Sequence, residues 1–108
     1  MPREIRWSRT ARANFSQILD FYLAHTGEEV TARLVTAIYK KLDFIAEQPY
    51  ASSISPQLPE NYRVAYVLKY KYAIYYKIMR QNAVKISIIQ HSSRKPPTPE
   101  KIIKASKN

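Results

Sequence analysis

Three consecutive runs of aromatic and β-branched residues dominate the second half of the chain. They span residues 62–68, 72–79 and 84–91, and polar residues separate them where turns are expected. Residues of this kind favour β-strands. Because successive side chains of a strand point to opposite faces of a sheet, we expect a small antiparallel sheet with one apolar face. The other face would carry Arg, Lys, Tyr and His and stay open to a ligand.

The alternation within residues 72–79 and 84–91 assigns individual side chains to these two faces. Counting by twos places Ile86 and Ile88 on the apolar face, and Ser87 and His91 on the opposite one. The same count leaves Tyr75 on the open face, where its ring, like those of Tyr66 and Tyr70, is a candidate for stacking on a base. We expect Tyr39, by contrast, to be buried or half-buried in or beside the core.

The first half of the chain predicts a short strand followed by two helices. Residues 4–7 have the alternating character of a strand, and Ser8 is a typical N-cap. Apolar residues then recur every three or four positions over 9–25 and again over 28–48. Gly27, the only glycine in the chain, separates the two segments. We therefore expect an antiparallel helical hairpin that covers the apolar face of the sheet, in an α+β fold of order β-α-α-β-β-β.

The connections and the tail complete a single predicted domain over residues 1–108. Residues 49–61 hold three prolines and three serines, which predicts an irregular crossing from the helices to the sheet. Prolines also extend the segment after residue 91, and Thr98 and Pro99 open a short terminal helix. We expect residues 96–108 to be a mobile tail unless Ile102 and Ile103 dock against the rest of the domain.

Charge is distributed unevenly along the chain. The protein has 18 Lys and Arg residues against 8 Asp and Glu residues, for a formal net charge of +10. Residues 1–60 contain seven cations and seven acids, whereas residues 61–108 contain eleven cations and a single acid, Glu100. Such an asymmetry is typical of a surface that binds nucleic acid or an acidic protein. We expect an anionic partner on the strand-rich half.

Several classes of function are disfavoured by what the sequence contains. There is no cysteine for disulfides or thiolate chemistry, and the acids and the two histidines are too dispersed to predict a metal site. One glycine cannot form a glycine-rich phosphate loop. The N-terminus has no apolar signal segment, and no run is long enough to cross a membrane. We therefore expect a cytoplasmic protein with no cofactor, no metal and no membrane partner.

Arg63, His91 and Arg94 are the candidate catalytic residues. They fall near the ends of the first and last strands of the predicted sheet, where side chains from different strands can converge. Cleaving RNA without metal requires a base, an acid and cations around the phosphate. His91 can serve either proton role at neutral pH, and both arginines can bind phosphate bidentately. The alternative is that His91 is a structural hydrogen-bonding residue and that the arginines are solvated surface charges.

Further residues of the second half are candidates for binding nucleic acid. Lysines supply charge to phosphates, and exposed tyrosines supply rings on which bases stack. The candidates are Lys69, Lys71, Lys77, Lys85, Lys95, Tyr70 and Tyr75.

At this point the residues resemble a known family. The opening segment I-R-W-S, the run KYKYAIYYKI and the ending VKISIIQHSSRKP look like those of the RelE/ParE toxins of bacterial type II toxin-antitoxin systems. The most specific parts are Y-x-I-Y-Y over residues 72–76, and H-x-x-R-x-P formed by His91, Arg94 and Pro96. The similarity covers nearly the whole chain.

The resemblance implies a small basic toxin that a cognate antitoxin neutralises. It implies one of two activities, ribosome-dependent cleavage of mRNA or inhibition of DNA gyrase. Arg63 resembles the phosphate-binding arginine of the nucleases, and His91 stands near the position of their acid or base. On these residues we favour RNA cleavage, with gyrase inhibition as the first alternative and a non-catalytic nucleic-acid-binding module as the second.

Overall fold

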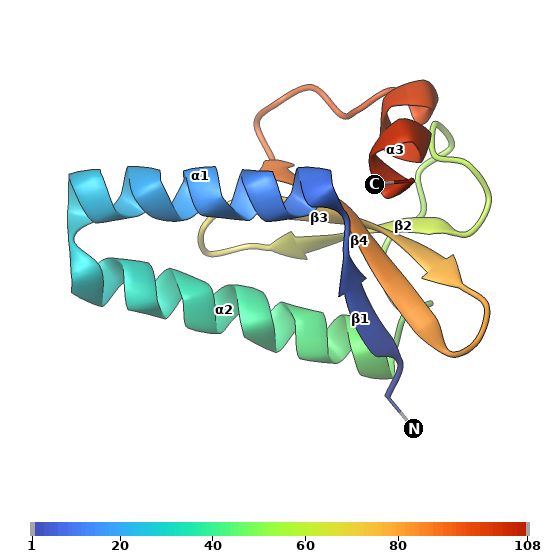
Figure 1. The fold of residues 1–108 in the computed structure, drawn as a ribbon, viewed down its shortest axis with the longest axis horizontal. Helices are drawn as coiled ribbons and strands as arrows, with labels where there is room; N and C mark the ends of the chain where they lie inside the picture. Colours follow the sequence, from blue (N-terminus) through green and yellow to red (C-terminus); the bar gives the residue numbers. More distant parts are fainter. Residues whose placement is uncertain (1, 108) are drawn as a thin grey trace.

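A four-stranded sheet packs between a helical hairpin and a short C-terminal helix (Figure 1). The computed structural model describes residues 2–107. Three helices and four strands confirm the predicted α+β class. In chain order the elements are β1 (Glu4–Trp7), α1 (Arg9–Thr26), α2 (Glu28–Glu47), β2 (Tyr62–Val67), β3 (Tyr72–Met79), β4 (Ala83–His91) and α3 (Pro99–Ser106).

The sheet is mixed rather than purely antiparallel. Its strand order is β1-β4-β3-β2, and β2, β3 and β4 form the expected antiparallel meander. The first strand adds to the far edge and runs parallel to β4, with Glu4 opposite Ala83 and Trp7 opposite Ile86. Parallel neighbours need a long crossover connection, and here the helices together with β2 and β3 provide it. The predicted antiparallel sheet is confirmed for β2, β3 and β4, and β1, for which no partner was predicted, makes the whole sheet mixed.

The helical hairpin begins and turns at two residues that the sequence singled out. The Ser8 hydroxyl accepts a hydrogen bond from the Ala11 amide at 2.9 Å and donates one to the Ser87 carbonyl at 2.8 Å, so the cap also ties α1 to the sheet. Gly27 joins the helices with φ +85° and ψ 179°, a conformation that is essentially restricted to glycine. The prediction of a helical hairpin with a very short loop is confirmed.

The main core lies between the helical hairpin and one face of the sheet. Apolar side chains of α1 and α2 meet alternate residues of all four strands there, as the period of each element requires. The Tyr76 hydroxyl reaches through this core and donates to the Pro49 carbonyl at 2.5 Å, which anchors the loop after α2. The fully buried members, with no more than 1% exposure, are Ala11, Leu34, Ile38, Ile45, Ile74, Tyr76, Val84, Ile86 and Ile89.

A β-bulge at Ser87 changes the face to which the end of β4 points. Tyr75 pairs with Ile88, but the next residue of β3 pairs with Ile86, so Ser87 is an extra residue. Beyond the bulge the alternation is inverted, and Ile89 joins the main core while Ile88 packs on the opposite face. The prediction that Ile86 and Ile88 share a face is therefore wrong.

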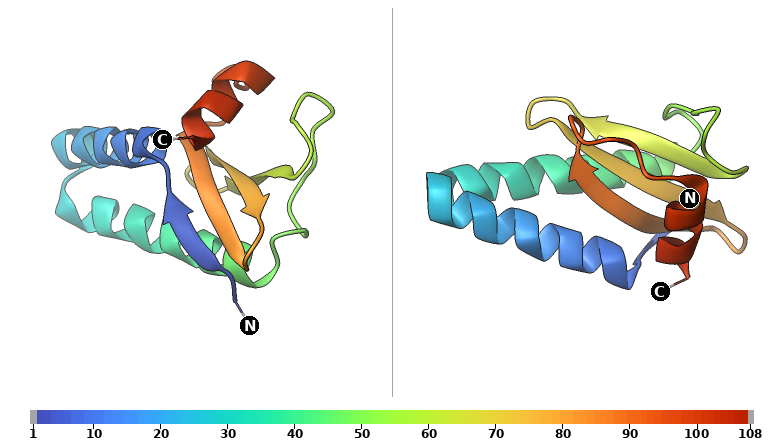
Figure 2. Two further views of the ribbon diagram at one scale, coloured as in Figure 1. Left: turned by 45° about the vertical axis from the view of Figure 1, so that its right-hand side comes forward. Right: turned by 90° about the horizontal axis from the view of Figure 1, so that it is seen from above.

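Helix α3 covers the sheet face that was expected to be open. Figure 2 shows it on the strands, away from α2. Thr98 caps α3 by accepting a hydrogen bond from the Lys101 amide at 3.2 Å. Ile102 is fully buried and Ile103 stays 38% exposed. Of the two isoleucines whose docking would oppose a mobile tail, one therefore docks against the domain. The second core consists of Tyr62, Val64, Ala73, Tyr75, Ile88, Ile102 and Ala105.

Candidate functional site

The structure does not bring the three predicted catalytic residues together. Arg63 pairs with Tyr76, just past the middle of β3, whereas His91 pairs with Tyr72, the first residue of that strand. At about 3.3 Å per residue, these positions are offset by about 13 Å along the strand, and two strand spacings separate them laterally. Arg94 lies on the side of His91. The expected convergence of Arg63 with His91 and Arg94 is therefore wrong.

Arg63 belongs to an aromatic and cationic corner beside the loop after α2. Its guanidinium lies 5.5 Å from the centre of the Tyr50 ring, and the guanidinium of Arg3 lies 5.9 Å from the same ring. Burial raises the pKa of the nearby Tyr76 hydroxyl, and the positive charge of Arg63 partly opposes that rise. Arg63 is half-buried, which suits an anchoring cation as well as a ligand-binding one.

His91 lies against the helical hairpin instead of on the opposite face, because the Ser87 bulge inverts the end of β4. Its ring stands edge-on to Tyr72 with centroids 5.5 Å apart. Its Nδ1 accepts a hydrogen bond from the Ser93 amide at 3.2 Å and lies 2.6 Å from the Ser93 hydroxyl. The neutral ring therefore carries its proton on Nε2, and Nδ1 shapes the turn that follows β4.

A small hollow beside the middle of α1 does join His91 to Arg94. Its volume is about 190 Å³, and α1 contributes polar side chains and an exposed aromatic ring to its wall. The Asn14 side-chain oxygen accepts a hydrogen bond from the Ile89 amide at 3.1 Å, so this wall is fixed to β4. The hollow offers one imidazole and one guanidinium, which can bind an anion but supply only one proton-transfer group.

The predicted nucleic-acid contacts divide between the two ends of the sheet. Lys77 and Lys85 are paired neighbours on the α3 face near the β3–β4 turn. Exposed Lys69 and Lys71 occupy the β2–β3 turn at the other end. Lys95 lies at that end too, since its carbonyl accepts a hydrogen bond from the side chain of Gln90, which pairs with Ala73. The five lysines therefore do not form one continuous track.

Of the three tyrosines that were predicted to stack on bases, Tyr66 is 39% exposed and the other two are engaged within the protein. Tyr75 is only 5% exposed because α3 packs over it, and burial together with the nearby Tyr66 raises the pKa of its hydroxyl. Tyr70 is half-buried and stands edge-on to Tyr22 at 6.3 Å. The prediction of an exposed Tyr75 is wrong, since it did not anticipate the cover that α3 supplies.

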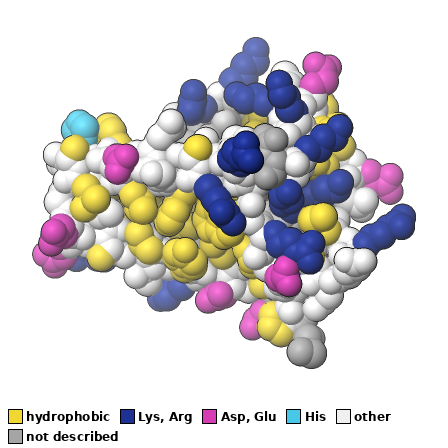
Figure 3. All heavy atoms as spheres, in the orientation of Figure 1, with side chains coloured by type: hydrophobic (Ala, Val, Ile, Leu, Met, Phe, Trp, Pro, Cys, Tyr) yellow, Lys and Arg dark blue, Asp and Glu magenta, His cyan; other side chains and the backbone are white. Residues whose placement is uncertain are grey.

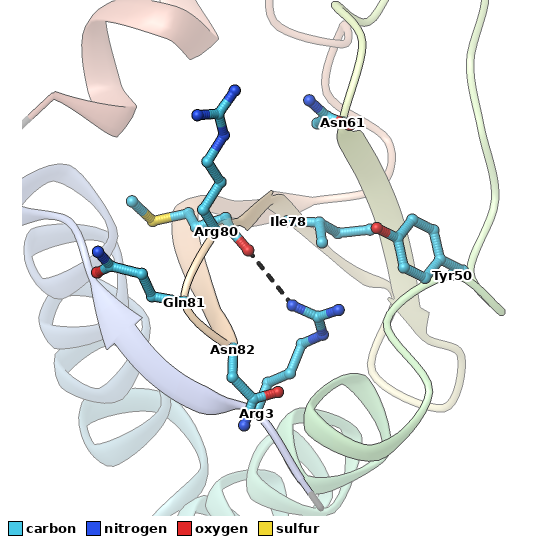
Figure 4. A pocket seen from close by; sticks show the side chains of 8 residues that line it. Arg3, Tyr50, Asn61, Ile78, Arg80, Gln81 and Asn82 are labelled. Atoms are coloured by element: carbon cyan, nitrogen blue, oxygen red, sulfur yellow. Dashed lines mark hydrogen bonds between the residues drawn. The ribbon is translucent and has the colours of Figure 1, made fainter.

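A cationic cluster at the β3–β4 turn was missed by the sequence reasoning. Arg3, Arg6 and Arg80 come from segments that are more than 70 positions apart, yet β1 and the turn are neighbours in the sheet. With Lys77 they line two adjoining hollows. Figure 4 shows Arg3, Arg80 and the Tyr50 ring around one of them. The signal was hidden because it depends on the parallel pairing of β1 with β4.

An aromatic groove lies on the helical hairpin. Trp7 and Phe15 are 5.3 Å apart between ring centres, and Phe15 meets Tyr39 edge-on at 6.1 Å. With Arg12 they line a hollow of about 210 Å³. Tyr39, which was expected to be buried or half-buried, is 48% exposed. Figure 3 shows hydrophobic side chains spread over the helices, while Lys and Arg side chains gather over the half that holds the sheet and α3.

Two features are absent from residues 2–107. In this part of the chain, no group of three His, Cys, Asp or Glu side chains is arranged to hold a metal ion. Within the same limits, no helix has both the length and the apolar character that crossing a bilayer requires.

The chain shares its fold and its sequence pattern with bacterial toxins. Residues 5–96 match the sequence profile of the family described as "ParE toxin of type II toxin-antitoxin system, parDE". Since this match covers most of the chain, the protein belongs to the ParE toxin family. A solved structure described as "Chromosomal ParDE TA system from P. aeruginosa" is similar in fold, with a TM-score of 0.69 and 18% sequence identity over 82% of this chain and 95% of that chain. No curated protein sequence matches this chain.

Membership of this family makes the protein the toxin of a type II toxin-antitoxin pair, so its natural partner is an antitoxin. The predicted toxin class is thereby confirmed.

Proposed function

We propose that this toxin acts on DNA gyrase by binding, and that it does not cut RNA. The separation of Arg63 from His91 carries the proposal. Metal-free cleavage of a phosphodiester needs a base, an acid and a cation within hydrogen-bond reach of one phosphate. Here Arg63 is offset from His91 by about 13 Å along β3, and the hollow that His91 shares with Arg94 supplies a single proton-transfer group. The Nδ1 atom of His91 is also occupied by Ser93. The ParE family match supports the same choice between the two activities that the sequence left open.

The test is expression of the toxin in a bacterium with separate readouts of mRNA integrity and DNA damage. We expect DNA-damage signalling with intact mRNA, and loss of supercoiling activity when purified gyrase is mixed with the toxin. His91→Ala and Arg63→Ala are the informative variants, because a nuclease that used His91 as acid or base would lose about 10² to 10⁴ in rate without it. Cleavage of mRNA that His91→Ala abolishes would refute the proposal.

The antitoxin is proposed to cover the aromatic groove on the helical hairpin. Trp7, Phe15 and Tyr39 present rings to solvent there, with Arg12 at the margin. Apolar patches of this kind typically mark protein-protein contacts, and an amphipathic helix laid in a groove is a common way to fill them. The net charge of +10 further favours an antitoxin that is acidic overall.

A further inference from the structure

We propose that the β3–β4 turn binds the phosphate backbone of duplex DNA. The residues are Arg3, Arg6, Lys77 and Arg80, which we call the turn cluster. The proposal goes beyond the action on gyrase, because it concerns contact between the toxin itself and DNA. It can be tested in the absence of gyrase, so its failure would leave the proposed function standing.

Two hollows adjoin at the turn and share Arg80. The first has a volume of about 450 Å³ and is lined by Arg3, Arg80, Tyr50 and side-chain amides (Figure 4). The second has a volume of about 400 Å³ and adds Arg6 and Lys77. Neither has an Asp or Glu among its described lining residues. Cations around two connected hollows suit a chain of phosphates better than a single small anion.

Strand pairing fixes the spacing of two cations of the turn cluster, Arg6 and Lys77, with Lys85 between them. Arg6 lies opposite Lys85, which in turn lies opposite Lys77, so three cations form a row across β1, β4 and β3. Neighbouring strands are about 4.8 Å apart, so the row spans about 10 Å. Arg80 continues the surface three residues beyond Lys77, about another 10 Å along the chain. This arrangement matches an extended polyanion, because repulsion among these like charges is relieved when several phosphates bind at once.

Arg3 is held in place before any ligand binds. Its guanidinium donates a hydrogen bond to the Met79 carbonyl at 3.3 Å and lies 5.9 Å from the centre of the Tyr50 ring. An arginine fixed in this way loses little side-chain entropy on binding and keeps further N–H groups for a phosphate. The tight turn itself is defined by Gln81 and Asn82, with φ +63° and +58°. Arg3 and the backbone of the turn are therefore preorganised.

One carboxylate competes for the turn cluster. Glu4 forms an exposed ion pair with Arg6 on the same strand. An exposed pair of this kind contributes little to stability, so a phosphate can displace Glu4 from Arg6 at small cost. This contact supplies a variant that should strengthen DNA binding, since Glu4→Gln removes the competing carboxylate and leaves Arg6 free.

An acidic protein is the other ligand that such charge would suit, and the character of the hollows favours DNA. Protein partners are usually anchored by apolar side chains in apolar pockets. At the turn Ile78 is buried and Met79 is half-buried, and the other side chains of the two hollows besides Tyr50 carry guanidinium, ammonium or amide groups. Tyr50 offers one exposed ring, already flanked by arginines. Groups of this kind are those that bind phosphate oxygens.

The experiment is a fluorescence-anisotropy titration of the full-length toxin, freed of antitoxin, with a labelled 20-base-pair duplex. Four phosphate contacts predict a log-log salt slope of about −3.6, so the affinity should fall roughly 100-fold between about 50 and 200 mM salt. Arg80→Ala should weaken binding and reduce the magnitude of the slope by about 1. Glu4→Gln should strengthen binding.

Arg33→Ala is the matched control. It removes the same charge from an exposed site on α2, at the end of the molecule away from the turn, and should leave affinity and slope nearly unchanged. Far-ultraviolet circular dichroism confirms that each variant is folded. An equal loss with Arg33→Ala, or a flat salt response, would overturn the proposal. The proposal would also be overturned if the toxin did not bind the duplex but bound pyrophosphate or polyglutamate in a way that depends on Arg80.

Discussion

The Ser87 hydroxyl lies 2.6 Å from the Ser106 hydroxyl, in the buried space between the bulge of β4 and the end of α3. Ser106 donates its proton to the Ile102 carbonyl at 2.8 Å and accepts a hydrogen bond from the Tyr62 hydroxyl at 2.9 Å. A serine hydroxyl has one proton and two lone pairs, so Ser87 must be the donor to Ser106. The bulge, the edge strand β2 and α3 are thus joined through one fully satisfied oxygen.

Ser106→Ala should destabilise the protein by about 1–3 kcal/mol, because it leaves the buried hydroxyls of Ser87 and Tyr62 without their partner. Urea unfolding followed by circular dichroism measures the change. Ser16→Ala, at an exposed position of α1, should stay within about 0.5 kcal/mol of the parent protein. Equal stability of the Ser106 and Ser16 variants would show that water reaches the network.

Ser87 explains why part of the fold could not be predicted from the sequence. The run Ile86-Ser87-Ile88-Ile89 is compatible with a regular strand, and nothing local in it marks Ser87 as an extra residue. The bulge becomes specified only when Ser8 and Ser106 contact Ser87 from elements distant in the chain. The periodic elements were predictable, since their patterns are local.

The candidate site was less predictable than the fold for the same reason. Its geometry depends on register and strand order, which a single sequence does not fix. Placing His91 required knowledge of the bulge, and finding Arg3 and Arg6 beside Arg80 required the parallel pairing of β1 with β4. Docking of Ile102 was foreseen only as a condition, because an eight-residue helix shows no local sign of what it will cover.

Gly27→Ala should destabilise the protein by about 1–3 kcal/mol through backbone strain alone. The φ of +85° is unfavourable for any residue with a Cβ, while a Cβ built at this site would meet no atom within 4 Å. Thermal unfolding measures the effect. Ala24→Ser, an exposed change in the last turns of α1, serves as the control. A Gly27→Ala protein as stable as the parent would mean that the hairpin turn relaxes to a different conformation.

The stability of the protein should decrease as pH rises from about 10 to 12. Burial, and next the adjacent Tyr22, raise the pKa of Tyr72 from its ordinary 10.0 to about 12. In this range the folded protein keeps a proton that the unfolded chain releases, so alkali favours unfolding. Tyr72→Phe should flatten the decrease, as measured by urea unfolding at each pH. Tyr50→Phe, at a 58% exposed ring, should leave the slope unchanged, and a parent protein with no slope would contradict the argument.

Tyr39→Glu should weaken binding of the antitoxin at least 10-fold while leaving the fold intact. The Tyr39 ring is 48% exposed and closes the aromatic groove against Phe15, so a carboxylate there would face both the apolar segment and the acidic charge proposed for the antitoxin. Isothermal titration calorimetry with the purified antitoxin measures the loss.

Two further variants separate groove contact from general charge. Tyr39→Phe keeps the ring and should bind nearly as the parent does. Lys40→Glu, exposed on the next residue of α2, changes the net charge by one unit more than Tyr39→Glu and leaves the groove untouched. If Lys40→Glu weakened binding as much as Tyr39→Glu, charge alone would account for the affinity, and the antitoxin would have to be placed elsewhere on the toxin. If Tyr39→Glu weakens binding more than Lys40→Glu, the antitoxin lies on the groove, because Tyr39→Glu is the variant of the two that removes an aromatic ring of the groove.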